Sequence, residues 1–154
     1  MNIHTQMENA QPTQTDHEEN AEGAAYFRYS ATLRIFGTIP DLDDITRNLG
    51  VSPTHSHRRG ERRSSLAEPY KHDMWSFKVP VGRTEPLHVH IDALWATLRE
   101  RKQYLLELKQ NDLSVDVFLG YRSSSDTAGV EVPYQSLQMF LELQVPFGLS
   151  IITA

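Results

Sequence analysis

The stretch FRYSATLRI, residues 27–35, alternates apolar and polar side chains at every second position. Successive side chains of a β-strand point to opposite faces of its sheet, so this pattern predicts a strand with one buried face and one wet face. The apolar side holds Phe27, Tyr29, Ala31, Leu33 and Ile35, and the polar side holds Arg28, Ser30, Thr32 and Arg34. A half-buried strand of this kind needs a sheet that is covered on one side only.

Further strands are predicted outward from this stretch. Trp75–Val81 and Leu113–Tyr121 repeat the alternation, and Phe147–Thr153 closes the chain as a fourth strand. Pro80 cannot donate a ladder hydrogen bond, which places it on an edge or at a strand end. Val130–Val132 is a candidate for a short fifth strand.

Three helical segments separate these strands. The first is Leu42–Leu49, with Asp41 as N-cap and Gly50 as the stop. The second starts at Thr84-Glu85-Pro86 with Thr84 as the cap, and we expect one element that reaches Lys109. Its apolar stripe fails at Arg101 and Lys102, which indicates either surface-lying side-chain stems or a bend. The third opens at Pro133, stops near Pro146, and has on its predicted buried side Tyr134, Leu137, Phe140 and Leu141.

The order strand, helix, strand, helix, strand, optional strand, helix, strand predicts an α+β fold. We expect a mainly antiparallel four- or five-stranded sheet with the helices packed on one face. A chain of 154 residues is long enough for one domain, which we assign to residues 25–154. Residues 1–24 lack aromatic side chains and are predicted to be a disordered acidic tail.

Charge and composition exclude several function classes. Residues 1–24 contain five acids and no Lys or Arg, which leaves fifteen acids against fifteen bases in the remainder. This balance argues against a dedicated nucleic-acid binder, although it leaves room for a local basic patch. The absence of cysteine excludes thiol catalysis and cysteine-bound metals. No signal peptide or membrane-span pattern is seen, so we predict a cytoplasmic protein.

The segment Thr54–Glu68 is the predicted location of a functional site. His55 and His57, in a loop or a strand, could form half of a metal site with His72 or Asp73 as a third ligand. Zinc sites normally take three or four ligands, so we favour two exposed histidines and predict no metal and no cofactor. The second pair, at positions 88 and 90, would point about 200° apart on a helix and cannot chelate one ion.

The same segment is dense in positive charge, with Arg58, Arg59, Arg62 and Arg63 around Glu61. Arginine forks bind phosphate and carboxylate in a bidentate manner, but a solvated loop that turns at Gly60 explains the cluster equally well. The wet sheet face would add Arg28, Arg34 and Lys78, with the aromatic rings of Tyr26 and Phe118 among them. Such a surface can stack single-stranded nucleic acid or dock a protein.

Beyond these patterns, the region Asp41–Trp75 resembles a bacterial family catalogued as domain of unknown function 4279. The residues that carry the likeness are Leu49-Gly50-Val51-x-Pro53-Thr54, Gly60 and Trp75, and it extends over about residues 29–153. The resemblance implies a compact single domain and supplies no reaction or catalytic residue. Small domains of this kind are often immunity or antitoxin-like proteins that act by surface contact.

No nucleophile elbow, phosphate loop or paired-carboxylate motif is present, so no catalytic residue is assigned. We therefore expect a non-enzymatic protein-binding module, such as an immunity protein or antitoxin, with another protein as partner and no role for a membrane. One alternative is a phosphate-handling or metal-dependent enzyme that uses His55, His57, Arg58 and Arg59. Another is weak single-stranded nucleic-acid binding. The oligomeric state is left open.

Overall fold

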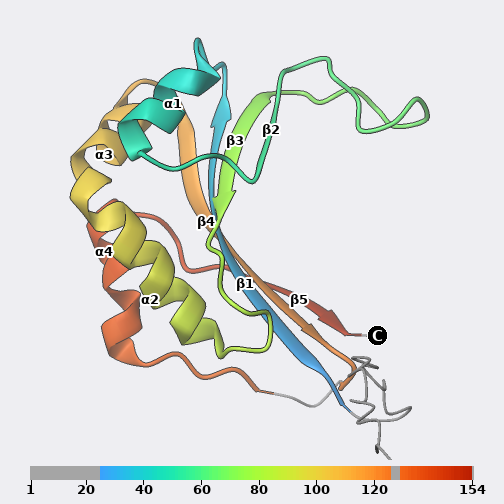
Figure 1. Cartoon of the computed structure of the whole chain (residues 1–154), viewed down its shortest axis with the longest axis vertical. Coiled ribbons are helices and arrows are strands. Elements are labelled where there is room, and N and C mark those ends of the chain that lie inside the picture. The colour runs from blue at the N-terminus through green and yellow to red at the C-terminus, as the bar shows by residue number, and fades with distance from the viewer. Residues whose placement is uncertain (1–24, 126–128, 154) are drawn as a thin grey trace, which may run out of the picture.

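The computed structural model describes residues 25–125 and 129–153 (Figure 1). The predicted tail, residues 1–24, lies outside this range. The strands are β1 (Phe27–Gly37), β2 (His55–His57), β3 (Asp73–Lys78), β4 (Ser114–Ser123) and β5 (Leu149–Thr153). The helices are α1 (Leu42–Leu49), α2 (Leu87–Leu98), α3 (Lys102–Gln110) and α4 (Gln138–Leu143), with 3₁₀ turns η1 (Arg99–Arg101) and η2 (Tyr134–Leu137).

The five strands form one open sheet in the order β2-β3-β1-β4-β5. The central strand β1 pairs antiparallel with β3 and with β4, and β2 pairs antiparallel with β3. Only β5 runs parallel to its neighbour, β4. All four described helices lie on one side of this sheet (Figure 1). The predicted α+β class, with a mainly antiparallel sheet and helices on one face, is confirmed.

The core fills the space between the sheet and its helices. Ala31, Leu33 and Ile35 of β1 are fully buried, as their alternation predicted, and Trp75 beside them on β3 is also fully buried. Phe27 shares their face but remains 37% exposed. The helices do not extend over that end of β1, so the face predicted to be buried is covered only along part of its length (Figure 1).

The helix boundaries agree with the sequence signals in α1 and differ in α2. Asp41 caps α1 by accepting a hydrogen bond from the Asp43 backbone N–H, and Gly50 ends the helix with a φ of 71°. In α2 the N-cap is Pro86, so the prediction of Thr84 as the cap is wrong. The helical hydrogen bonding starts where the Val89 N–H donates to the Pro86 carbonyl, two residues later than a Thr84 cap requires.

The expected single element reaching Lys109 is divided, and the bend that the failed apolar stripe left open is the alternative that the structure shows. The turn η1 separates α2 from α3 at Arg99–Arg101, where the apolar stripe fails in the sequence. None of its three residues is buried, whereas Leu98 and Leu105 on either side are buried. The tighter turn therefore lets the chain change direction where no side chain needs to reach the core.

Two predictions in the C-terminal third are wrong. Val130–Val132 is not a strand, and the fifth strand is β2 at the opposite edge of the sheet. Tyr134 and Leu141 are 80% and 77% exposed. The segment opens with η2, whose three residues per turn rotate the apolar face relative to a continuous α-helix. The side chains that α4 buries are Met139, Phe140 and Leu143.

An imidazole side chain lies inside the core. His90 of α2 is fully buried, and neither of its ring nitrogens makes a hydrogen bond. Burial penalises the charged imidazole and lowers the pKa of His90 below 6.5. Lys78 acts in the same direction, whereas the Glu85 carboxylate and nearby backbone oxygens of Gly82 and Glu85 oppose part of the shift. The core is thus most favourable when His90 is neutral.

We expect the protein to lose stability in mild acid through His90. Because its pKa is lower in the folded state, protonation favours the unfolded chain as the pH falls below 6.5, and the loss is complete below the folded pKa. In His90→Leu, the difference between urea midpoints at pH 7.5 and pH 5.0 should shrink. The buried, non-ionising change Ile91→Val serves as the control and should leave that difference as in the wild type. An equal pH response in His90→Leu and the wild type would contradict this account.

Candidate functional site

The sheet face opposite the helices carries the polar side chains of the alternating strands. Arg34 lies between Ser76 of β3 and Asp116 of β4, and Thr32 lies between Lys78 and Phe118. Towards the N-terminal end of β1, Ser30 faces Gly120, and Arg28 faces Arg122. The structure thus places Arg28, Arg34 and Lys78 on one face, where the alternation predicted them.

A hollow of about 240 Å³ lies at the Arg28 end of this face. Four positive side chains line it, which we call the basic groove: Arg28, Lys78, Arg83 and Arg122. No carboxylate lines it, and none of these four side chains forms an ion pair with an acid of the described residues. Positive charge that protein acids leave uncompensated favours an anionic ligand.

Small residues line the middle of the groove. Ser30, Gly120 and Ser150 are register partners on three adjacent strands, and all three line the hollow. A Cβ on Gly120 would lie only 2.5 Å from the Ser30 Oγ, so this close packing excludes a larger residue unless Ser30 moves. A glycine inside a strand often marks a place where a ligand approaches the backbone closely. Here the Ser30 hydroxyl takes up the space above Gly120, and the small residues Ser30, Gly120 and Ser150 line the hollow between the flanking charges.

Two groove residues were missed by the sequence analysis. Arg122 continues the alternation of β4 on the polar side, two residues beyond Gly120, so the period-two signal could have revealed it. Arg83 follows the end of β3 and carries no periodic signal. The structure holds its segment against β1 through a hydrogen bond of 2.7 Å from the Tyr29 N–H to the Arg83 carbonyl. This long-range bond, together with the one from the Val79 N–H to the Ala31 carbonyl, holds the segment after β3 against β1 and so brings Arg83 to the groove.

An arginine lies over each of two aromatic rings of this face, Phe118 and Tyr26. The Arg34 guanidinium lies 4.8 Å from the centroid of the Phe118 ring and forms two hydrogen bonds with the Asp116 carboxylate, at 2.8 and 2.6 Å. These bonds raise the pKa of Arg34. The Arg28 guanidinium lies 5.1 Å from the centroid of the Tyr26 ring. Arg34 is therefore neutralised locally, whereas Arg28 is held in place by its ring without an opposing carboxylate.

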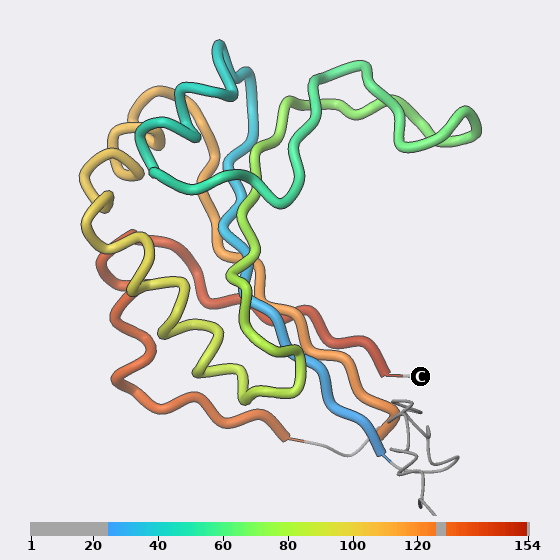
Figure 2. Tube along the Cα trace, in the orientation of Figure 1, coloured from blue at the N-terminus to red at the C-terminus, as the bar shows by residue number. Residues whose placement is uncertain are grey.

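The predicted loop site lies at the other end of the sheet. β1 pairs Gly37 with Asp73 at the loop end and Arg28 with Arg122 at the groove end, which is about 30 Å away at roughly 3.3 Å per residue. The β2–β3 loop projects from the sheet on the side away from the helices (Figure 2). The arginines at positions 58, 59, 62 and 63 therefore do not join Arg28 and Lys78 in one site. His55 pairs with Ser76, two residues from Lys78, but neither His55 nor His57 lines the hollow.

The two histidines of β2 contact each other, and the expectation that both are exposed is wrong for His57, which is buried. The His55 Nε2 and His57 Nδ1 atoms are 2.9 Å apart, a hydrogen bond in which one ring donates and the other accepts. The Tyr70 ring stacks on His57 with 3.5 Å between centroids. Burial, and then the charge of His55, lower the pKa of His57. Within residues 25–125 and 129–153, no three side chains of histidine or acid converge as a metal site would require.

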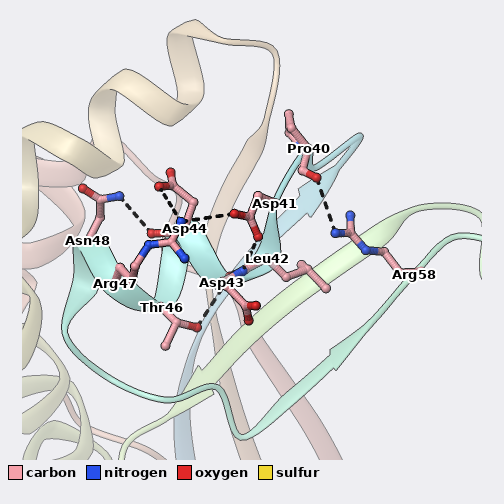
Figure 3. A network of polar contacts seen from close by, with 9 residues as sticks. All are labelled: Pro40, Asp41, Leu42, Asp43, Asp44, Thr46, Arg47, Asn48 and Arg58. Atoms are coloured by element: carbon pink, nitrogen blue, oxygen red, sulfur yellow. Dashed lines mark hydrogen bonds and ion pairs between the residues drawn. The ribbon is translucent and has the colours of Figure 1, made fainter.

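Within the loop cluster, Arg58 and Asp73 tie the loop to the rest of the fold. The Arg58 guanidinium donates to the carbonyls of Ile39 and Pro40, the latter shown in Figure 3, and lies 3.5 Å from the Asp73 carboxylate. That carboxylate also accepts hydrogen bonds of 2.8 Å from the backbone N–H groups of Ile39 and Arg59. These backbone bonds, with a smaller contribution from Arg58, lower the pKa of Asp73.

The other predicted loop residues make mostly local contacts. Glu61 accepts a hydrogen bond from the Arg58 N–H, and Arg62 donates to the Ala67 carbonyl. Arg59, Glu61, Arg62 and Arg63 are all exposed. Four of the ten predicted site residues are therefore exposed charges in a projecting loop, whereas Arg58 and His57 help to hold that loop in place.

Fold and surface together define a small α+β domain whose sheet has one face covered by helices and one face open. The chain belongs to the family described as domain of unknown function (DUF4279), whose sequence model matches residues 27–153. The resemblance stated from the motif residues is thereby confirmed. No curated protein and no solved structure matches the chain. Of the helices in the described part of the chain, none has the length and apolar character needed to cross a bilayer.

Proposed function

We propose that this domain is a non-enzymatic, cytoplasmic protein-binding module that takes an acidic segment of its partner in the basic groove. It would act by surface contact, as an immunity protein or antitoxin does. The observation that carries this proposal is the convergence of Arg28, Lys78, Arg83 and Arg122 on one hollow without a lining carboxylate. Arginine forks bind carboxylates in a bidentate geometry, which gives such a surface directional preference.

A protein partner is favoured over nucleic acid by the state of the aromatic rings. Single-stranded nucleic acid is bound by stacking its bases on open aromatic faces. In this protein the Arg34 guanidinium already lies over the Phe118 ring, and the Arg28 guanidinium lies over the Tyr26 ring. The equal numbers of acids and bases after residue 24 also give no net positive field to attract a polyanion.

A binding role is favoured over catalysis by the chemistry of the groove. Its lining residues include no histidine, acid or cysteine that could act as a general base or nucleophile. The histidine pair, which the enzyme alternative requires beside the arginines, lies on the edge strand β2 opposite Met74 and Ser76, does not line the groove, and is engaged in its own hydrogen bond. The serines, tyrosines and lysine of the groove therefore have no histidine or carboxylate in the lining to activate them, which favours recognition over reaction.

The proposal is tested with a fluorescein-labelled peptide of eight glutamates, titrated by fluorescence anisotropy at 50 mM salt. The groove variant Arg28→Gln/Lys78→Gln/Arg83→Gln/Arg122→Gln should bind at least about tenfold more weakly than the wild type, because four charge-assisted contacts are lost. The matched control Arg59→Gln/Arg62→Gln/Arg63→Gln/Lys71→Gln removes four exposed loop charges and should stay within about twofold.

Two results would overturn the proposal. One is a groove variant that binds the peptide as tightly as the loop variant, since both have the same net charge. The other is a fifteen-nucleotide thymidine oligomer that binds more tightly than the peptide at the same salt concentration, which would indicate a nucleic-acid protein instead. Melting temperatures of both variants should stay near that of the wild type, since all eight side chains are exposed.

A further inference from the structure

We infer that the acidic N-terminal segment of this chain, residues 1–24, is an intramolecular ligand of the basic groove and competes with an acidic partner there. The inference rests on the groove of the proposed function and adds how that groove is regulated. It joins a positive surface that has no acid in its lining to a negative segment that has no lysine or arginine.

The charges of the two parts are complementary. The segment contains Glu8, Asp16, Glu18, Glu19 and Glu22 and neither lysine nor arginine. The remaining residues carry fifteen acids and fifteen bases, so these five acids account for the whole net charge of −5. No other stretch of comparable length in the chain lacks bases while carrying this many acids.

The segment joins the fold beside the groove. Tyr26 is fastened to the end of β4 by two hydrogen bonds with Ser124, one of 3.0 Å to its hydroxyl and one of 3.3 Å from its backbone N–H. Arg28 covers the Tyr26 ring, and its register partner is Arg122. Residue 24 is therefore two positions from a ring that touches a groove cation, at the end of the sheet where the hollow lies.

Covalent reach permits the contact. Glu22 precedes Arg28 by six residues, which span at most about 20 Å, and Asp16 by twelve, which span about 40 Å. A tether of this length holds the acids near the groove at an effective concentration in the millimolar range. Individual exposed charge pairs are weak, so the segment would leave again when a partner offers acids in a better geometry.

The test uses the full chain and its lack of cysteine. Thr13→Cys introduces the sole thiol for a nitroxide spin label between Glu8 and Asp16. Paramagnetic broadening of backbone amide signals at 50 mM salt should centre on Arg28, Ser30, Gly120 and Arg122. The broadening should lose this focus, and become weak and evenly distributed, at 0.5 M salt. The same loss is expected in the five-acid variant Glu8→Gln/Asp16→Asn/Glu18→Gln/Glu19→Gln/Glu22→Gln.

Peptide affinity gives the second measurement. The five-acid variant should bind the octaglutamate peptide about fivefold more tightly than the wild type, because the competitor is lost. Its matched control removes five exposed acids of the folded part and should give a smaller gain. That control is Glu68→Gln/Asp92→Asn/Glu100→Gln/Glu107→Gln/Glu131→Gln.

Broadening that centres on the β2–β3 loop, or a profile that the five-acid variant shares with the wild type, would overturn the inference. So would equal affinity gains in the two five-acid variants. These outcomes differ from failure of the proposed function, which is read from the groove and loop variants without altering residues 1–24. If the peptide binds in the groove but the broadening is uniform, only the intramolecular competitor is rejected.

Discussion

Trp75→Ala should lower the free energy of unfolding by about 4 kcal/mol, the largest loss expected from a single change in this protein. The Trp75 side chain is fully buried on the central part of the sheet. Its indole N–H donates a hydrogen bond of 3.0 Å to the Thr46 Oγ1 and so fastens α1 to β3. Alanine would leave a large cavity there and would free the Thr46 hydroxyl at the same time.

Two milder variants separate the packing of Trp75 from its hydrogen bond. Trp75→Phe retains most of the apolar volume but loses the hydrogen-bond donor, and Thr46→Val removes the acceptor. Each should lower the free energy of unfolding by about 1 kcal/mol. Urea unfolding followed by far-ultraviolet circular dichroism gives all three values. A loss below about 1.5 kcal/mol in Trp75→Ala would mean that α1 does not depend on this contact.

Asp73→Ala should cost about 3 kcal/mol, since it leaves two backbone N–H groups without an acceptor. The Asp73 side chain is 12% exposed and bonds the backbones of Ile39 and Arg59, which precede it by 34 and 14 residues. It also faces the Arg58 guanidinium at 3.5 Å. The substitution should therefore lower the urea midpoint of unfolding. It should also loosen the β2–β3 loop, so that proteolytic cleavage near Gly60 becomes faster.

The pH dependence gives this prediction a second check. The pKa of Asp73 is lowered in the folded state, so its stabilisation is present above about 3.8 and disappears as the pH falls through the folded pKa. The difference between the wild type and Asp73→Ala should shrink between pH 5 and pH 2. Glu68→Ala changes an exposed acid in the same loop and should match the wild type throughout. A constant difference down to pH 2 would show that the carboxylate charge is not involved.

Most of the fold followed from local patterns. Period-two alternation located β1, β3 and β4 because each has one face in the core and one in water. The cap pair Asp41 and Gly50 located α1. The apolar spacing predicted the wrong buried face for this segment because it assumed one continuous α-helix. The 3₁₀ turn η2 rotates the side chains relative to α4, and the apolar spacing in the sequence does not reveal that turn. The strand β2 was not assigned because its three residues gain their structure from pairing with β3.

The site was predicted only in part, for a reason of topology. Charge density in the sequence pointed to positions 58–63, whereas the groove combines one cation from each of β1, β3 and β4 with Arg83 from the segment after β3. Arg28 and Arg122 are 94 residues apart and become neighbours only when β1 pairs with β4. The alternation of each strand predicted which sheet face its arginine would occupy. It did not predict that Arg28 and Arg122 would be directly opposite each other on neighbouring strands.

The central place of β1 affects how the chain folds during synthesis. Of the described strands, β1 is synthesised before the others and is also the middle of the sheet. Its two partners begin 36 residues (β3) and 77 residues (β4) after β1 ends. Until β4 emerges, one edge of β1 has its backbone donors and acceptors open to other chains. Pairings of such long sequence separation form slowly, so the nascent domain passes through a stage that needs protection from association.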